Sequence, residues 1–449
     1  MKKLFAVFTV FLLTNNAFLS AQKIQGSIIN PESEKIFILN RSSNVVFSAD
    51  VDLKTGTFSD IFKKECEPGF YTLKYGHETT SMYLEPSFDL TITLDTREFD
   101  ESISYKGTGA EYNNFLAKKF LLEEQGYGNL GKLYSSNETD FLKKLNTVQK
   151  KEEKLLANLS DNDFVKKERQ AIKYHKLVFL LNYQSYHAYL THNNTFKVSA
   201  SFLAPIDSID YDNETDFLNS KDYQELVNKY YTDPVLSSQN IKDAILKIEH
   251  IKSPIIKSAE MNQLLRFIAP SLGNLDSINW AVQNYMTDKD FKEKIAQKTD
   301  VCKNVSKGHL SPSFSYKDID GNTVSLSDFK GKLVYIDVWA TWCAPCRREI
   351  PFLKKMAKAY EGKAIEFVSI SVDNKSAYDK WKKMVKSQTD NWHQLFADKS
   401  WNSDFTQAYM INSIPSFILI DKEGKIVSPD ATRPSNPVTS KMIDDLLAN

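Results

Sequence analysis

The fold of the C-terminal third is decided by one stretch, Trp339-Ala340-Thr341-Trp342-Cys343-Ala344-Pro345-Cys346. The residues before it, 333–338, are apolar except for Asp337 and indicate a buried strand. A helix is predicted over 344–360, so both cysteines lie at a helix start, one turn apart. Unpaired backbone N–H groups there favour negative charge and raise the thiolate fraction of Cys343. We therefore predict that Cys343 attacks a partner's disulfide and that Cys346, one turn deeper and shielded, resolves the mixed disulfide.

Strands and helices alternate around this stretch. Apolar runs predict strands over 333–338, 365–372, 416–420 and 425–427, and helical spacing predicts helices over 344–360, 377–386, 403–409 and 437–447. Asn436 is a candidate N-cap of the last helix, with Pro437 at its first position. This order predicts a central sheet covered on both faces, an α/β fold, over 304–449.

Two other readings of the cysteine pair stay open. A structural zinc site would need a second Cys or His pair nearby, and the seven histidines are scattered, so no metal site and no cofactor is predicted. An inert structural disulfide is also compatible with the spacing. A pair at a helix start is, however, the most exchangeable arrangement of that kind.

Four segments carry a family resemblance: residues 339–351, the preceding 318–332, Ser413-Ile414-Pro415-Ser416-Phe417, and 420–425. Together they resemble the thioredoxin superfamily, and most of all its exported TlpA-type disulfide reductases. The resemblance implies a thioredoxin fold with a strand–helix insertion over 377–401. It also implies that Pro415 is a cis-proline facing the sulfurs, with the Ile414 backbone free to bind a substrate strand. Trp342, Ala344 and Pro345 then contact the substrate, while Trp339 is core and Pro351 bends the helix.

Asp337 interrupts the apolar strand six positions before Cys343. A carboxylate buried there is unfavourable, so its pKa should be raised. The resemblance implies the buried acid of thioredoxin, which acts through water as base for the deeper cysteine, and we hypothesise that Asp337 deprotonates Cys346. The alternative is a hydrogen-bonded strand-end aspartate without a catalytic role. The lysine that accompanies this acid in thioredoxin is replaced here by Ser369.

The three residues after the pair, Arg347, Arg348 and Glu349, are predicted to be solvated helix surface. Cys66 and Cys302 are either two buried thiols or one disulfide that ties the β-rich N-terminal region to the linker before the last third of the chain. An auxiliary redox role for either cysteine is less favoured.

The rest of the 449-residue chain is long enough for further domains. Short alternating segments, such as 88–94, predict a β sandwich or small barrel over 22–107, and longer Lys-, Glu- and Leu-rich segments predict an α-helical domain over 108–303. Residues 303–313 form the predicted linker. The two N-terminal regions resemble, more weakly, the extensions of such reductases in Bacteroidetes-type bacteria. They are predicted to select or position the partner.

The first residues are typical of a secretory signal. Lys2 and Lys3 precede an apolar run over 4–13, and Leu19-Ser20-Ala21 ends in a small residue, which predicts cleavage near Ala21–Gln22 and export to the periplasm. An uncleaved anchor is the alternative. Equal numbers of basic and acidic residues, 57 each, argue against a nucleic-acid partner.

The predicted function is that of a periplasmic thiol–disulfide oxidoreductase, and the Ala344-Pro345 pair resembles the reducing end of the superfamily. The family implies two partners: exported proteins that contain disulfides, and a membrane protein that supplies electrons. One alternative is a disulfide oxidant or isomerase, and another is an envelope binding protein with a vestigial redox module. A thiol peroxidase ranks last, because peroxidatic cysteines lack this local context.

Overall fold

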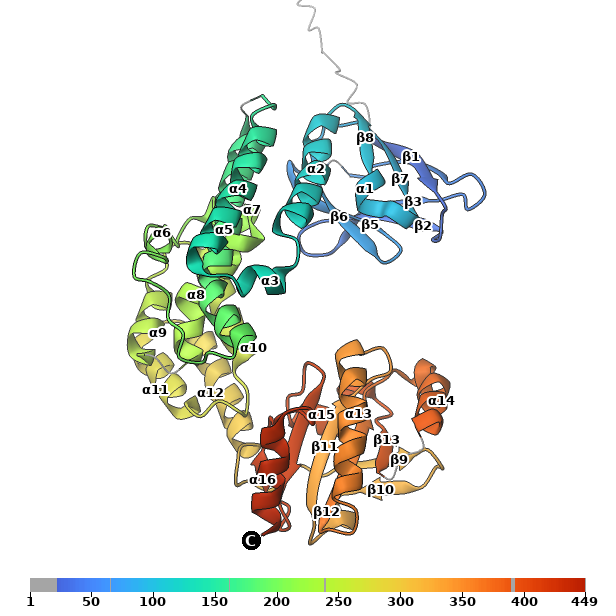
Figure 1. Cartoon of the computed structure of the whole chain (residues 1–449), viewed down its shortest axis with the longest axis vertical. Helices are drawn as coiled ribbons and strands as arrows, with labels where there is room; N and C mark the ends of the chain where they lie inside the picture. Colours follow the sequence, from blue (N-terminus) through green and yellow to red (C-terminus); the bar gives the residue numbers. More distant parts are fainter. Residues whose placement is uncertain (1–21, 65, 161, 238–239, 389–391, 449) are drawn as a thin grey trace, which may run out of the picture. The chain divides into compact units, whose positions relative to one another are not determined.

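The structure is a computed structural model that describes residues 22–64, 66–160, 162–237, 240–388 and 392–448 (Figure 1). The predicted signal, 1–21, lies outside the described residues. The chain divides into two compact units, Met1–Leu226 and Val227–Asn449. The division falls inside helix α8 (Lys221–Leu236), so the helical region predicted over 108–303 contributes to both units.

The N-terminal unit begins with strands β1 (Lys23–Ile29), β2 (Lys35–Leu39), β3 (Val45–Asp50), β4 (Thr57–Ile61), β5 (Gly69–Tyr75), β6 (Glu78–Leu84), β7 (Leu90–Asp95) and β8 (Ser104–Gly107). They form two four-stranded sheets, in the orders β4-β1-β7-β8 and β3-β2-β5-β6. Leu90, Ile92 and Leu94 alternate inward along β7 and are almost completely buried, as their spacing predicts. One hydrophobic core joins both sheets.

Helix α2 (Ala110–Tyr127) covers one edge strand of each sheet through two neighbouring asparagines. The Asn113 carboxamide accepts a hydrogen bond from the Tyr83 N–H and donates one to the Tyr83 carbonyl, both at 2.9 Å. Asn114 makes the same pair of bonds with the backbone of Tyr105 in β8, at 3.0 and 2.8 Å. Each side chain therefore replaces one residue of a missing strand and satisfies backbone groups at a sheet edge.

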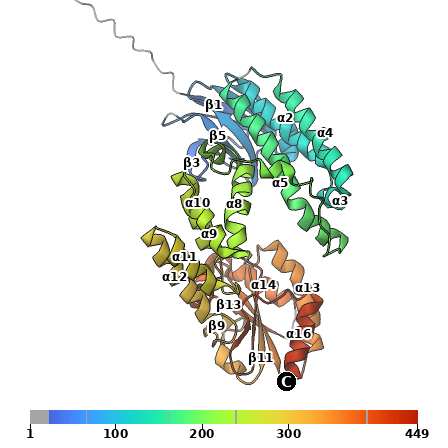
Figure 2. The same cartoon turned by 90° about the vertical axis from the view of Figure 1, so that its left-hand side faces the viewer.

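Two long helices follow: α4 (Glu138–Leu156) packs against α2, and α5 (Asp163–Thr191) packs against α4 (Figure 2). The side chains of Asn137 and Asn162 cap them by accepting the N–H groups of Asp140 and Val165. Shorter helices complete this unit: α1 (Phe99–Ser102), α3 (Leu130–Tyr134), α6 (Ala204–Asp207) and α7 (Glu214–Asn219). None of the helices in the described ranges is long and apolar enough to cross a membrane.

The C-terminal unit starts with a helical part and continues into a mixed sheet. The helices are α9 (Ile241–Glu249), α10 (Pro254–Phe267), α11 (Leu275–Tyr285) and α12 (Lys289–Asn304). The strands that follow are β9 (Ser315–Asp318), β10 (Thr323–Ser325), β11 (Leu333–Trp339), β12 (Ile365–Ser371), β13 (His393–Phe396), β14 (Ser416–Ile420) and β15 (Ile426–Ser428). They form one sheet in the order β10-β9-β13-β12-β11-β14-β15.

The centre of this sheet positions the site. Strands β11, β12 and β13 are parallel, whereas β14 runs antiparallel to β11. Helices α13 (Ala344–Ala359) and α16 (Pro437–Leu447) pack in one hydrophobic cluster on one face, and α14 (Tyr378–Gln388) and α15 (Asp404–Ala408) pack in another. Strand β13 lies inside the predicted insertion 377–401. The bounds of β14 and α16 agree with the prediction, and Asn436 caps α16 by accepting the Val438 N–H at 3.0 Å.

Candidate active site

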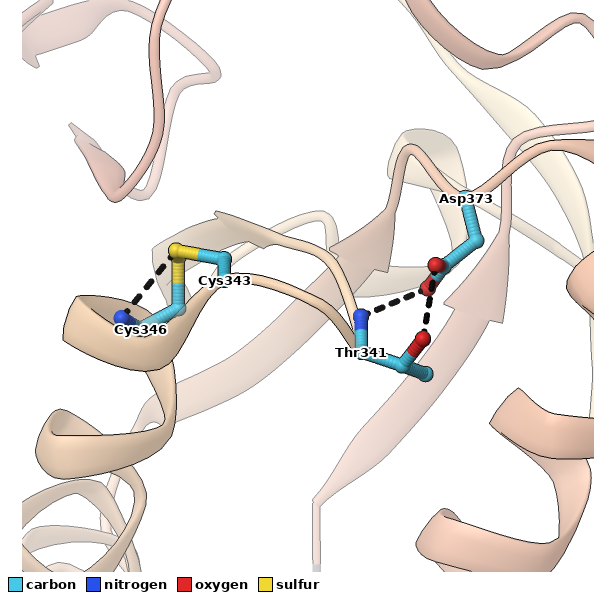
Figure 3. The surroundings of a disulfide bond; sticks show 4 residues. All are labelled: Thr341, Cys343, Cys346 and Asp373. Atoms are coloured by element: carbon cyan, nitrogen blue, oxygen red, sulfur yellow. Dashed lines mark hydrogen bonds between the residues drawn. A yellow bond between two sulfur atoms is a disulfide. The ribbon is translucent and has the colours of Figure 1, made fainter. Parts of the chain in front are cut away.

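Cys343 and Cys346 form a disulfide at the start of α13 (Figure 3). Strand β11 ends at Trp339, a short loop over 340–342 follows, and Cys343 is the N-cap residue of the helix. The Cα atoms of the two cysteines are 5.3 Å apart. The helix start therefore brings the two sulfurs together, as the spacing predicts.

The helix start also provides a donor to the first sulfur. The Cys346 N–H donates to the Cys343 Sγ at 3.1 Å. An N–H in this position and the dipole of the helix are the groups that would stabilise a thiolate on Cys343 once the disulfide is reduced. Both cysteines are only 3% exposed, whereas Trp342 beside them is 56% exposed. Cys346 is shielded as predicted, but Cys343 is equally shielded in this oxidised state.

Asp337 is buried in β11, opposite Ser369 of β12. Its Oδ2 accepts a hydrogen bond from the Ser369 hydroxyl at 3.0 Å, and the Trp392 indole N–H donates to that hydroxyl oxygen at 2.9 Å. Burial raises the pKa of Asp337 to about 7, Ser369 opposes the rise, and the charge of Glu349 adds to it. The structure thus places Ser369 against the acid, as the sequence comparison with thioredoxin suggested.

Glu349 corrects one expectation. Arg347 and Arg348 are exposed as predicted, but Glu349 is buried, with 9% of its surface exposed. Its two carboxylate oxygens accept the N–H and the hydroxyl of Ser435, both at 3.0 Å. Glu349 follows Cys346 by three residues and precedes Leu353 by four, so the inward stripe of α13 could have revealed its position.

A third buried carboxylate, Asp373, was not singled out from the sequence. It follows β12, where the carboxyl end of that strand meets the carboxyl end of β11. Figure 3 shows it bonded to Thr341 in the loop that leads to Cys343: Oδ2 accepts the Thr341 N–H and Oδ1 accepts the Thr341 hydroxyl, both at 2.8 Å. The Ser371 hydroxyl donates to Oδ2 at 2.8 Å. Asp373 therefore fixes the loop that carries Trp342 and Cys343.

The predicted proline loop lies beside the carboxyl end of β11. The Ile414–Pro415 peptide bond is cis, and Ser416 pairs with Val338 near the end of β11. Ile414 and Pro415 are half-buried. Ala344 is exposed and Pro345 half-buried at the helix start, and Pro351 lies inside α13. The residues predicted to contact a substrate are thus at least partly accessible at one end of the sheet.

The two remaining cysteines are buried thiols rather than halves of one disulfide. Cys302, in α12, lies with its Sγ 3.4 Å from the Sδ of Met410. Burial raises the pKa of the Cys302 thiol to about 11, which disfavours the reactive thiolate.

Known proteins resemble the C-terminal part of this chain in sequence. Residues 306–446 match the family model described as Redoxin. The thiol-disulfide oxidoreductase ResA of Bacillus subtilis is 30% identical over 144 residues, which are 32% of this chain and 75% of that protein. The ResA of Bacillus thuringiensis is 32% identical over 120 residues, 27% of this chain and 66% of that protein. The crystal structure of a thioredoxin domain of a Bacteroides vulgatus thiol-disulfide oxidoreductase is 32% identical, with 32% of this chain and 98% of that chain covered and a TM-score of 0.29.

Proposed function

We propose a function from one premise, that this chain belongs to the Redoxin family of thiol-disulfide oxidoreductases through its residues 306–446. The proposed function is disulfide reduction outside the cytoplasm, by a protein of the TlpA type. One observation carries the proposal: the Cys346 N–H is directed at the Cys343 sulfur at the start of α13. That arrangement favours a nucleophilic thiolate on Cys343 and a resolving thiol one turn below it.

The first step is an attack by the Cys343 thiolate on one sulfur of a substrate disulfide. The substrate S–S bond breaks, the distal sulfur leaves as a thiolate, and a mixed disulfide joins the substrate to Cys343. Trp342 is exposed next to this sulfur, and Ile414 is partly exposed at the proline loop. In the proposal both contact the substrate, together with Ala344, Pro345 and Pro415. Asp373 acts as a positioning residue because it holds Thr341 of the same loop.

The second step forms the disulfide that the structure contains. Cys346 must lose its proton, and its thiolate then attacks the Cys343 sulfur. The mixed disulfide breaks, the substrate leaves with both sulfurs reduced, and two electrons have passed to it. Asp337 is the proposed base and acts through a water molecule. Its pKa of about 7 supports this role, because a base is most effective when its pKa lies near the working pH.

Continued turnover requires a donor that reduces the Cys343–Cys346 disulfide. We assign this role to a membrane protein that passes electrons outward, and the substrates to exported proteins with disulfides. Both assignments rest on the predicted signal segment 1–21 and on the resemblance to TlpA-type reductases.

The decisive experiment is the reduction potential of the Cys343–Cys346 pair in the full chain. The protein would be equilibrated across a dithiothreitol or glutathione series and its free thiols trapped, with Cys302→Ala as a background that leaves only the pair and Cys66 to titrate. A potential near or below about −230 mV supports a reductase. A potential above about −180 mV makes the protein an oxidant or isomerase instead. A Cys343–Cys346 disulfide that is not reduced anywhere in the series would favour the alternative of an envelope binding protein.

A further inference from the structure

A continuous groove crosses the outer face of the second sheet in the N-terminal unit. Two adjoining cavities form it, of about 230 and 350 Å³, and they share the lining residues Thr72, Ser81 and Lys221. Thr72 of β5 and Ser81 of β6 are directly opposite each other, so their side chains share one face. We name this feature the β6 groove. None of its lining residues belongs to the Cys343–Cys346 site described above.

One side of the β6 groove is an open strand edge. Among the described strands, β6 pairs only with β5, and its outward backbone groups at Tyr83 bond the Asn113 side chain. Outward and inward groups alternate along an antiparallel strand, so the N–H and C=O of Ser81 and Thr79 also point outward. Across the described ranges, no strand and no asparagine covers the edge at these two residues. At Thr79 and Ser81, beyond the residue that Asn113 bonds, the strand edge therefore has backbone groups that a further strand could pair with.

The walls of the groove are unequal in charge. At one end Lys119 is already neutralised, because its Nζ lies 2.8 Å from Glu168 and 3.9 Å from Glu123. At the other end Arg41 donates only to the neutral Asn219 side chain, at 2.7 Å, and no salt bridge of the described residues involves Arg41 or Lys221. Of the described residues that line this second cavity, none is an aspartate or glutamate.

Apolar side chains supply the remaining contacts. Phe120 of α2 and Leu218 of α7 line the groove and are 44% and 38% exposed. Side chains of an extended chain alternate in direction, so they can meet apolar contacts on one side and cations on the other.

We propose that the β6 groove binds an extended, acidic segment of a partner polypeptide, which adds a strand to β6 at Thr79 and Ser81. Backbone hydrogen bonds to the strand edge would supply sequence-independent affinity, and Arg41 and Lys221 would select for carboxylate side chains. Binding in this way needs no redox step. It therefore stands or falls separately from the proposed reductase function.

The test is selection from a display library of random ten-residue peptides on the full chain. We expect enrichment of proline-poor peptides rich in aspartate and glutamate. With a selected peptide bound, hydrogen exchange at the amides of Thr79 and Ser81 should slow at least about tenfold, because these N–H groups become hydrogen-bonded. Methylation of alternate peptide nitrogens should abolish binding in one register and leave it intact in the other.

Charge variants provide the matched control. Lys221→Glu and Arg41→Glu should each weaken the selected peptide about tenfold, in a salt-dependent manner. Lys106→Glu changes the same charge at an exposed position of β8, in the other sheet and outside the groove, and should leave affinity within about twofold. The proposal is overturned by a library that yields no enriched peptides, by basic peptides, or by peptides that bind without slowing exchange at Thr79 and Ser81. Equal loss in all three charge variants would also overturn it, because that indicates only long-range attraction.

Discussion

Strand β11 of the C-terminal unit and the α2–α4–α5 helices of the N-terminal unit each bury a carboxyl group, with different partners. Asp337 has one hydroxyl donor, Ser369, and its pKa is raised to about 7 by burial and by Glu349. The pKa of Glu152 is raised to about 8, first by burial and then by Glu123, although cations lie near this carboxyl group.

The two acids differ in the cations around them and in their distance along the chain from the redox disulfide. Lys119 and His175 both lower the pKa of Glu152, and Lys119 also bonds Glu168, so this acid belongs to a compensated network. No cation contributes to the shift of Asp337, which lies in the strand that leads to the disulfide. Burial thus raises the pKa of both acids. Only Asp337, which has no nearby cation to offset burial, acts as a base in the proposed mechanism. The predictions below test that division.

The largest effect is expected from the redox pair itself. Cys343→Ser should reduce turnover of a protein disulfide by at least about a thousandfold, because it removes the nucleophile. Cys346→Ser should also stop turnover but should accumulate the mixed disulfide, which mass spectrometry detects. Cys66→Ala and Cys302→Ala are the controls and should retain activity. Loss of turnover in either control would assign redox chemistry to a part of the chain outside the pair.

Asp337→Asn should slow resolution of the mixed disulfide by about a hundredfold and leave the first attack largely unchanged. In the native protein the base is ionised above a pH of about 7, so the rate of resolution should fall as the pH drops below that value. The variant should lose this dependence. Glu152→Gln is the matched control, a second buried acid neutralised, and should keep the native pH–rate profile. An unchanged profile in Asp337→Asn would leave Asp337 a structural residue only.

The two asparagines of α2 allow a comparison within the N-terminal unit. Asn113→Ala leaves both backbone groups of the fully buried Tyr83 without partners, and should destabilise the sheets by about 2 kcal/mol. Asn114→Ala exposes the corresponding groups of Tyr105 in a less buried place and should cost about 1 kcal/mol. Hydrogen exchange of β6 and β8 amides measures each loss locally. A larger effect for Asn114 would contradict the assignment of Asn113 as the more buried cover.

Sequence patterns predicted the C-terminal unit more fully than the N-terminal one, for a physical reason. Periodicity shows which face of a strand or helix is buried, and an interrupted pattern exposes a residue such as Asp337. The contact between Asp337 and Ser369 follows from strand order. Glu349 was misplaced because two arginines precede it, although the helical stripe passes through its position. Asp373 and Asn113 were not predicted, because a polar side chain that hydrogen-bonds a distant backbone group produces no periodic pattern in the sequence. The partner of Asn113, for example, is 30 residues away.

The smallest expected effect is a pH dependence of stability in the N-terminal unit. The folded protein holds the Glu152 proton up to a pH of about 8, whereas an unfolded chain releases it near the ordinary glutamate pKa of 4.5. The folded state therefore binds more protons between these two pH values. Stability of this unit should therefore fall as the pH rises from about 4.5 to about 8, and level off above that. Glu152→Gln cannot ionise, so its stability relative to the native protein should increase over the same window, by on the order of 1 kcal/mol. All six tryptophans lie beyond residue 226, so tryptophan fluorescence reports on the C-terminal unit. Hydrogen exchange in α2 and α4 is therefore the suitable measurement. A relative stability that instead fell with rising pH would mean that Lys119 and His175 hold Glu152 as a carboxylate, and the contrast with Asp337 would then be one of charge as well as of surroundings.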